Sequence, residues 1–396
     1  MTGSVKGYYR YTDIWFKWPE QKDVGPEAAE AIKAVLAHDA LCSNENPLHI
    51  DGVDGAQLFI GTLKSGENRI LFSSKQVEYI RYWVHAMRLT ESLAPLPHSN
   101  CLLRDQDLRG VCPQVFKTGG DLKIASKQIG KNNKSIKKSN DPPLTFRRNT
   151  FERVRSLWQG KVGVWCAVDF EAWELDHRLI TEFGWSLIRW EDGKEVQQEG
   201  HLIVKEHRLY TNSVYVRGNR DNYKHGVSEI VTKKDFKDRV QKLFHDLKSN
   251  DSVFLVFHDA NEDIKYLRSS MVEVDLTGLS YTLPSGSSPQ NDIFVVDTVD
   301  LFGGLQGEGN SSRGLEQVCN QLGLNPEFMH NAGNDAHYTL AACKEMANGD
   351  AVDLQRDKRW PGQTVPGTLR VDIDALDDED APESDDLEEI YQKALN

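Results

Sequence analysis

The chain has 396 residues, 39% of them apolar, which is enough for two folded units that each bury a core. Its formal net charge of -13 argues against a general polyanion binder, because binding phosphates needs a local excess of Lys and Arg. There is no signal-peptide core and no apolar run near the roughly 20 residues of a membrane span, so we expect an intracellular protein, cytoplasmic or nuclear, without a membrane partner. The six cysteines lack CxxC spacing and are expected to be reduced, packed thiols.

Residues 1–110 are predicted to form a small α+β unit, whose role would be to dock a partner. A helix is expected from Pro26 to about His38, since Pro suits the first turn of a helix. The runs QLFIGTL and RILFSS predict two strands. A second helix follows, where Ser73 and Gln76 have the spacing of a capping box ahead of apolar residues at helical spacing.

An aromatic stretch, GYYRYTDIWFKW, opens this unit. Its aromatic side chains alternate with Arg10 and Lys17, a combination that can stack unpaired bases. Packing inside the unit or against a partner is the favoured interpretation, and base stacking is the alternative. The aromatic residues concerned are Tyr8, Tyr9, Tyr11, Trp15 and Trp18.

Charge is distributed unevenly along the chain. Residues 117–161 hold twelve Lys or Arg and three acids, and the polar run GKNNKSIKKSNDPP within them cannot bury enough apolar area to fold alone. Residues 111–159 are therefore predicted to be a basic linker. Residues 371–390 hold eleven acids and no basic residue, so residues 349–396 are predicted to be an acidic disordered tail, which could mask the basic linker or a nucleic-acid groove.

Residues 160–348 change to a pattern of strands and helices. The runs KVGVWCAVDFEAW, EFGWSLIRW and QEGHLIVKE predict three strands in an antiparallel meander. The segments that follow alternate between helices and strands, and one of the strands is DIFVVDTVDLF. This order predicts an α/β domain with a mixed sheet flanked by helices.

Two carboxylates end the first of these strands. Asp169 and Glu171 are two residues apart, so both side chains point to the same face of the sheet. Like charges held together are costly unless a cation compensates them, and carboxylates without Cys suit Mg²⁺ or Mn²⁺. A strand end that simply turns into solvent is the alternative.

Two further polar clusters follow in the same domain. HDANED comes directly after the apolar strand SVFLVF and places Asp263 in the first turn of a helix, where the helix dipole favours an acid. HNAGNDA precedes another helix: Asn334 can cap it, Asp335 falls in its first turn, and His330 lies in the loop before it. Each cluster alone can be structural, but four carboxylates and a histidine together are the components of two-metal phosphodiester hydrolysis.

The three motifs, in this order and spacing, resemble those of the DEDDh group of 3′ to 5′ exonucleases, in the ribonuclease-H-like superfamily. The resemblance covers about residues 160–348 and implies a mixed five-stranded sheet, two bound Mg²⁺ or Mn²⁺ ions, and His330 as the base that deprotonates the attacking water. The metal ligands that it implies are Asp169, Glu171, Asp263 and Asp335. The substrate contacts that it implies are Phe170, Trp173, His258 and Asn331.

Several positions depart from the family pattern. Ala172 and Trp173 replace the usual Thr-Gly after the first motif, and Trp173 either stacks on the terminal base or packs within the protein. Asp259 and Glu262 replace Asn and Phe in the second motif and add negative charge beside the expected metal ligands. Within the superfamily, DFEAWE, ITEFGWSL and HNAGNDAHYTL are similar to a fungal branch that includes suppressors linked to a DEAD-box mRNA-export helicase, and to an Argonaute-associated silencing exonuclease.

The sequence and this resemblance together predict a metal-dependent 3′ to 5′ exonuclease that hydrolyses single-stranded RNA or DNA, with RNA favoured, to nucleoside 5′-monophosphates. The resemblance implies work in RNA processing or silencing, with an RNA helicase or an Argonaute as partner. One alternative is a catalytically silent, nuclease-like adaptor in an mRNA-export or silencing complex, which need not bind metal. Another is an RNA clamp whose affinity survives loss of all four acids.

Overall fold

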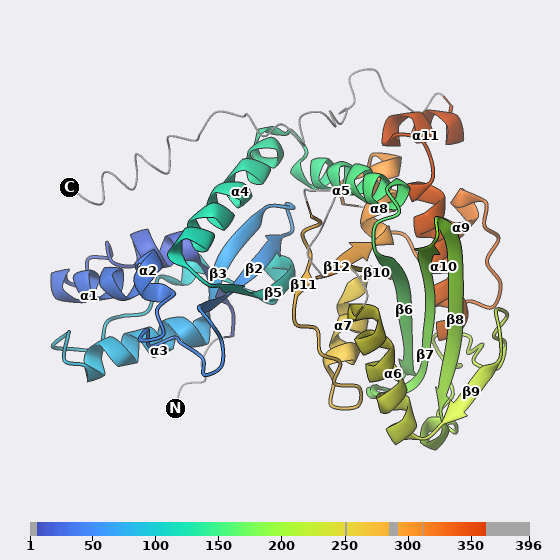
Figure 1. Cartoon of the computed structure of the whole chain (residues 1–396), viewed down its shortest axis with the longest axis horizontal. Helices are drawn as coiled ribbons and strands as arrows, with labels where there is room; N and C mark the ends of the chain where they lie inside the picture. Colours follow the sequence, from blue (N-terminus) through green and yellow to red (C-terminus); the bar gives the residue numbers. More distant parts are fainter. Residues whose placement is uncertain (1–5, 250–251, 285–291, 311, 362–396) are drawn as a thin grey trace.

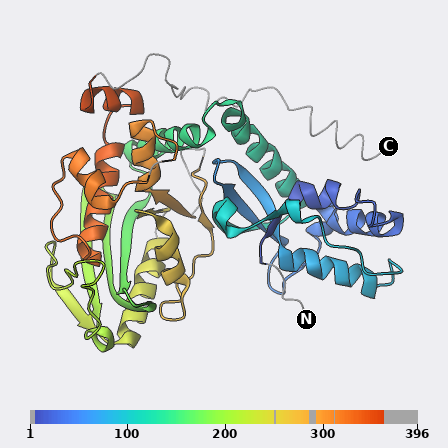
Figure 2. The same cartoon turned by 180° about the vertical axis from the view of Figure 1, so that it is seen from behind.

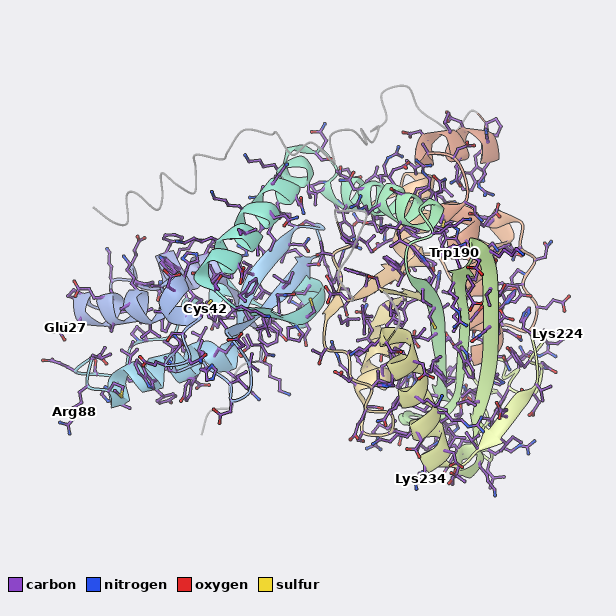
Figure 3. All side chains as sticks on the ribbon, viewed as in Figure 1. Glu27, Cys42, Arg88, Trp190, Lys224 and Lys234 are labelled. Atoms are coloured by element: carbon purple, nitrogen blue, oxygen red, sulfur yellow. The ribbon has the colours of Figure 1, made fainter. Side chains whose placement is uncertain are left out.

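The computed structural model describes residues 6–249, 252–284, 292–310 and 312–361. An N-terminal unit and a C-terminal domain lie beside each other, and two helices run between them at one side (Figures 1 and 2). In Figure 3 the side chains of Glu27 and Arg88 mark the outer end of the N-terminal unit, and that of Lys224 marks the opposite outer side of the C-terminal domain.

The N-terminal unit is an antiparallel sheet with helices packed on it, as the sequence predicts. The strand order is β4-β1-β3-β2-β5. The strands are β1 (Tyr8–Arg10), β2 (Ala56–Leu63), β3 (Asn68–Ser73), β4 (Leu102–Leu103) and β5 (Leu108–Phe116). The helices are α1 (Pro26–Leu36), α2 (His38–Leu41) and α3 (Ser74–Ala86), with short helical turns at Asp13–Lys17, Ser99–Cys101 and Asp105–Asp107. Strand β5 crosses the boundary expected at residue 110.

The first turn of α3 and the aromatic stretch show how the sequence builds this unit. The backbone N–H of Gln76 donates to Ser73 Oγ at 3.3 Å, and that of Ser73 donates to Gln76 Oε1 at 2.9 Å, which completes the predicted capping box. Tyr9, Tyr11 and Trp18 are each at most 6% exposed and belong to the core of the unit. Packing, rather than base stacking, therefore accounts for these three rings.

Residues 119–159 correct the prediction of a linker, because they fold into helices α4 (Gly119–Lys138) and α5 (Pro142–Gln159). On α4, Leu122 and Ile136 are buried on one face, whereas the exposed lysines gather on the other. Those exposed lysines are Lys123, Lys127, Lys131, Lys134 and Lys137. The high lysine content makes this segment look like a linker by composition. A few apolar residues are nevertheless enough to pack an amphipathic helix on the sheet.

A buried asparagine fixes α4 to the N-terminal sheet. Asn133 is 3% exposed; its Oδ1 accepts from the backbone N–H of Asn68 at 2.9 Å, and its Nδ2 donates to the carbonyl of Asn68 at 2.8 Å. We expect Asn133→Ala to lower the free energy of unfolding by about 1–3 kcal/mol, because it leaves buried backbone groups without partners. Urea denaturation checks this, with Lys134→Ala on the exposed face as the control. Equal stability of the two variants would contradict a packed α4.

The C-terminal domain is built on a seven-stranded mixed sheet in the order β11-β12-β10-β6-β7-β8-β9. The strands are β6 (Val164–Trp173), β7 (Asp176–Glu191), β8 (Lys194–Val204), β9 (Ser228–Val231), β10 (Val253–Phe257), β11 (Leu279–Ser280) and β12 (Ile293–Asp297). Strands β6, β7 and β8 form the predicted antiparallel meander, and β10 and β12 continue the sheet in parallel with β6. The two strands beyond the expected five are the short edge strands β9 and β11.

Helices cover both faces of this sheet. One face packs against α6 (Lys233–Lys248) and α7 (Ala260–Arg268), and the other packs against α5, α8 (Thr298–Gln306), α9 (Leu315–Leu322) and α10 (Ala332–Ala347). The predicted strand DIFVVDTVDLF is split, because Asp297 accepts a hydrogen bond from the backbone N–H of Val299 and thereby starts α8. These layers are those of a ribonuclease-H-like α/β fold.

The remaining expectations concern the tail, the cysteines and membranes. Helix α11 (Val352–Arg359) lies inside the segment predicted to be a disordered tail, and the acidic residues 371–390 lie outside the described residues. All six cysteines are free thiols, and five are buried, as expected. In the part of the chain that the structure describes, no helix has the length and apolar character that crossing a bilayer requires.

Candidate active site

The two faces of strand β6 carry different layers of the domain. Cys166, Val168 and Phe170 belong to the core under α6 and α7, whereas Trp165 and Ala167 belong to the core under α10. Asp169 and Glu171 continue the second series at the end of the strand. Their carboxylates therefore lie on the face of the sheet that packs against α10. Their two-residue spacing predicts that they share one face.

Helix α10 starts in direct contact with strand β7, which brings its first turn to these carboxylates. Gly184 pairs with Asp169 across the β6–β7 ladder. A Cβ atom at Gly184 would lie 2.0 Å from the carbonyl oxygen of Ala332, so only glycine lets the backbones approach this closely. Asp335, three residues into α10, is 7% exposed and sits against the end of β6.

The loop before α10 explains the spacing of its histidine and aspartate. His330 has a left-handed backbone (φ 64°), and its N–H donates to Asp335 Oδ2 at 2.9 Å. The helix cap is Asn331, whose Oδ1 accepts from the N–H of Asn334 at 3.0 Å; this corrects the expectation that Asn334 caps the helix. The Asn331 amide also donates to the carbonyl of Arg220 at 2.9 Å, and the side chain is fully buried. Asn331 thus has a structural role here and is not placed to contact substrate.

Asp263 joins the cluster from the first turn of α7. Its Oδ1 accepts a hydrogen bond from the backbone N–H of Phe170 at 3.1 Å, which ties α7 to the end of β6. Glu171, His330 and Asp335 can bring one ligand atom each within 4.8 Å of one another. The structure therefore gathers all five residues that the motifs single out, from β6, α7 and α10 with its preceding loop.

Burial and mutual repulsion dominate the electrostatics of this cluster. Burial, and then the charges of Asp263 and Asp335, raise the pKa of Asp169 well above its usual range, and burial and Glu182 do the same for Glu171. Burial raises the pKa of Asp263 to about 8 and that of Asp335 to about 7. Asp169 Oδ2 and Asp335 Oδ1 are buried without a hydrogen-bond partner among the described residues. These donor atoms, all oxygens, fit hard divalent cations, which would relieve the repulsion.

This arrangement predicts how stability depends on pH and on divalent cations. The carboxyl pKa is near 4 in an unfolded chain, but about 8 for Asp263 and about 7 for Asp335 in the folded protein. Between these pH values the folded state binds more protons, so without divalent ions the free energy of unfolding should fall as pH rises from about 4 to 8. Added Mg²⁺ or Mn²⁺ should reduce this fall. Urea denaturation at several pH values, in EDTA and in Mg²⁺, measures it; stability that increases with pH in EDTA would contradict the assignment.

Glu182 is a fifth buried carboxylate that was not among the predicted site residues. It is 5% exposed, pairs with Glu171 across the β6–β7 ladder, and accepts a hydrogen bond from the N–H of Ala332 at 3.3 Å. Its Oε2 lies 3.1 Å from Nε2 of the buried His201. A lone Glu within the apolar run ITEFGWSLI is the sequence signal that could have marked it.

A pocket of about 150 Å³ opens beside His330. Glu182, Arg220 and Asn222 are among the residues that line it. The Arg220 guanidinium donates to the carbonyl of Tyr210 at 3.1 Å, which orients it along the pocket wall. Arg220 is a second residue that was not predicted for the site, because the residues around it carry no recognisable motif.

The other predicted substrate contacts differ in their surroundings. Both ring nitrogens of His258 are bonded within the protein, to Thr298 Oγ1 at 2.9 Å and to the carbonyl of Arg313 at 2.8 Å, so both are already engaged. The ring of Phe170 is 7% exposed and packs in the core. Trp173 is partly buried and lies 4.9 Å from the ring of Tyr210, another residue of the pocket.

The two acids that depart from the family's second motif lie at the protein surface. Asp259 and Glu262 are both exposed, and Glu262 pairs with Lys265 at 2.5 Å. Their charges contribute to the raised pKa of Asp263, after burial. They therefore add to the repulsion near the site without occupying it.

Comparison with known proteins agrees with this geometry. Residues 164–346 match the family described as "DEDDh_C: DNA polymerase III subunit epsilon-like, C-terminal domain". The chain is 27% identical over 244 residues to the Saccharomyces cerevisiae protein named "Good for full DBP5 activity protein 2", which covers 55% of this chain and 42% of that protein. It is 28% identical over 190 residues to a nucleolar protein of Schizosaccharomyces pombe, which covers 46% of this chain and 68% of that protein.

The matched region coincides with the described domain and contains every residue of the carboxylate cluster. It begins with the first residue of β6 and ends within α10, the elements that carry the first and third motifs. Over residues 164–346, a little less than half of the chain, this protein is therefore similar to the DEDDh_C family.

Proposed function

We propose that this protein removes nucleotides from the 3′ end of single-stranded RNA or DNA by metal-dependent hydrolysis and releases nucleoside 5′-monophosphates. The observation that carries the proposal is the meeting of Asp169, Glu171, Asp263 and Asp335, on three elements of one domain, with His330 at the edge of the same cluster. Holding four carboxylates together would cost folding free energy in a protein that never bound a cation.

The four carboxylates would hold two Mg²⁺ or Mn²⁺ ions. When bound, the ions supply positive charge that stabilises the phosphate as it is attacked and as the leaving oxygen departs. The raised pKa values and the unpaired oxygens of Asp169 and Asp335 support this assignment. The choice of carboxylate ligands favours hard ions over zinc at this site.

In this proposal His330 would take the proton from the attacking water. Its backbone is fixed by the hydrogen bond to Asp335 and its side chain is exposed at the pocket mouth. Partial desolvation lowers the pKa of His330, and Glu316 opposes this shift, so the imidazole is neutral and can accept a proton at neutral pH. A base must stand within reach of solvent and of the cluster, and this loop position meets both requirements.

The exposed lysines of α4 are proposed to contribute to binding of the nucleic-acid backbone. Lys123, Lys127 and Lys134 lie on the solvent face of the helix in a protein of net charge -13. Contacts between lysines and phosphates release counterions, so this part of the affinity should weaken as salt increases.

The cellular role is proposed from the relatives. One of them is named for DBP5 activity and another is nucleolar, which supports a role in RNA processing beside an RNA helicase, in the nucleus or cytoplasm. An Argonaute partner in RNA silencing is the other proposal, carried by motif similarity alone. Since the chain spans less than half of the first of these relatives, its partners are tested separately from its chemistry.

The deciding experiment is digestion of single-stranded RNA and DNA that carry a 5′ label, in Mn²⁺ or Mg²⁺. A ladder that shortens from the 3′ end, with nucleoside 5′-monophosphates as products, is expected for the full chain. His330→Ala should slow digestion by about 100-fold or more, the usual contribution of a positioned general base. Absence of digestion together with micromolar to millimolar Mn²⁺ binding would overturn the exonuclease proposal; absence of both would favour the nuclease-like adaptor.

A further inference from the structure

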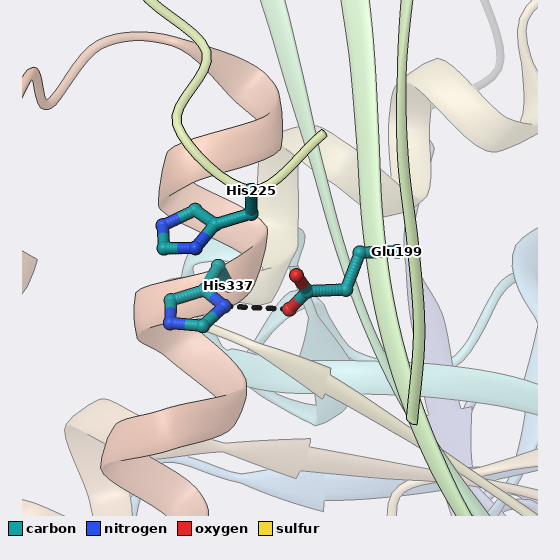
Figure 4. Close-up of side chains that lie close together, drawn as sticks. All are labelled: Glu199, His225 and His337. Atoms are coloured by element: carbon teal, nitrogen blue, oxygen red, sulfur yellow. Dashed lines mark hydrogen bonds and ion pairs between the residues drawn. The ribbon is translucent and has the colours of Figure 1, made fainter. Parts of the chain in front are cut away.

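A second group of side chains that can bind a metal ion lies outside the carboxylate cluster (Figure 4). Glu199 lies on β8, His225 in the segment before β9, and His337 on α10. One ligand atom from each lies within 4.8 Å of the other two, and all three side chains are partly buried. Because three separate segments supply the donors, this group is a product of the tertiary fold.

Glu199 is held in place by neighbours on β7 and β8. Its Oε1 accepts hydrogen bonds from Ser186 Oγ at 2.8 Å and from Gln197 Nε2 at 2.7 Å. The same oxygen lies 2.5 Å from His337 Nδ1. A carboxylate whose orientation is fixed by outer hydrogen bonds is the usual arrangement of a metal ligand.

His225 is held against His337 but lacks a partner for one nitrogen. Its ring stacks on that of His337 with centroids 3.4 Å apart and planes inclined by 9°. The neighbouring backbone N–H of Lys224 donates to Asn334 Oδ1 at 3.0 Å, which anchors the segment to α10. Nε2 of His225 is buried without a hydrogen-bond partner within the described residues. A buried imidazole nitrogen with no partner points to a ligand that completes it.

We propose that Glu199, His225 and His337 bind one divalent ion of the zinc class. Two imidazoles and a carboxylate, with a free position for water, are a ligand set that zinc takes, whereas the acids of the nuclease site suit Mg²⁺ or Mn²⁺. Zinc bonds of about 2.0–2.2 Å set two ligand atoms of one ion farther apart than the 2.5 Å that now separates Glu199 Oε1 from His337 Nδ1, and rotation of the two rings can supply this change.

The position of this ion gives it a structural consequence. His337 is two residues beyond Asp335 on α10, so the ion would tie the helix that carries this acid to β8 and to the segment before β9. Binding to the folded state alone should raise the thermal stability of the protein in proportion to the logarithm of the ion concentration. The proposal does not require the domain to be catalytically active.

Titration of the full-length chain with Co²⁺, in excess Mg²⁺ that competes at the carboxylate site, tests this inference. We expect one Co²⁺ per chain, with the visible absorption of a four-coordinate ion, and displacement of the Co²⁺ by Zn²⁺. His225→Ala and Glu199→Gln should each weaken binding at least about 10-fold, since each removes a ligand. His177→Ala, at an exposed position of β7, is the matched control and should bind as the parent does.

A further variant separates this group from the nuclease site, because Co²⁺ could also reach Glu171, His330 and Asp335. With His330→Ala the absorption should persist. An absorption that is lost in His330→Ala but kept in His225→Ala would overturn the proposal, and so would a parent protein that binds no Co²⁺. Circular dichroism verifies that the variants fold. If His225→Ala does not fold, the Glu199→Gln result decides, because glutamine keeps the shape of the side chain and one oxygen that can accept its hydrogen bonds.

Discussion

Asp169→Asn is expected to lower the rate of 3′ digestion at least about 100-fold and, at the same time, to raise the melting temperature of the metal-free protein. The loss of rate follows from removing a charged ligand at the centre of the cluster. The gain in stability follows because the carboxylate of Asp169 is buried near Asp263, Asp335 and Glu171, whose charges raise its pKa. Each kcal/mol of repulsion that the amide removes should raise the melting temperature by about 2–4 °C.

A lower digestion rate together with a higher melting temperature distinguishes a metal site from a buried hydrogen-bond network that only stabilises the fold. If Asp169 were a structural hydrogen-bond acceptor, its replacement would destabilise the protein, but its Oδ2 has no hydrogen-bond partner among the described residues. Asp192→Asn is the matched control, because it makes the same chemical change at an exposed turn between β7 and β8 and should alter neither property. A variant that digests as fast as the parent, or that melts lower in EDTA, would contradict the assignment.

The higher melting temperature of Asp169→Asn should disappear when divalent ions are present. In saturating Mn²⁺ the parent protein is stabilised by binding, whereas Asp169→Asn binds more weakly and gains less. The order of the two melting temperatures should therefore reverse between EDTA and Mn²⁺. Differential scanning calorimetry in the two buffers makes the comparison on the same samples.

The residues of the candidate site could be predicted where the information is local. Asp169 and Glu171 end an apolar strand with two-residue spacing, so their shared face follows from strand geometry alone. His330 and Asp335 flank the start of a helix, and that position also depends on neighbouring residues only. The fold class followed for the same reason, since most of the longer strands and helices of residues 160–348 carry their own apolar period, whereas the short edge strands β9 and β11 were not expected.

The residues that sequence reasoning missed depend on long-range pairing. Glu182 joins the cluster because the β6–β7 register sets it opposite Glu171, and a shift of one residue would turn it to the other face. His225 and His337 meet only after the segment before β9 folds onto α10. The polar composition around Asn133 predicts a linker, although this buried amide helps to hold a lysine-rich helix on the sheet.

Gly184→Ala is expected to reduce both stability and digestion, because the added methyl group has no space. Its Cβ would lie 2.0 Å from the carbonyl oxygen of Ala332 and 2.3 Å from the backbone nitrogen of Gly333, and backbone atoms cannot rotate away as a side chain can. Either β7 or the start of α10 must move. Overpacking of this kind costs about 1–3 kcal/mol of unfolding free energy, which urea denaturation measures.

The loss of digestion should exceed what the loss of stability explains. Displacing the start of α10 moves Asp335 and His330 away from Asp169 and Glu171, so the rate should fall even at temperatures where the variant is fully folded. Mn²⁺ affinity should fall with it, because the ligands come from both sides of the Gly184 contact. Gly130→Ala is the control within a helix: a Cβ there meets nothing within 4 Å, so it should stabilise the protein by about 0.5–1 kcal/mol and leave digestion unchanged. A Gly184→Ala protein with the parent's rate and Mn²⁺ affinity would show that the close contact between β7 and α10 does not position the site.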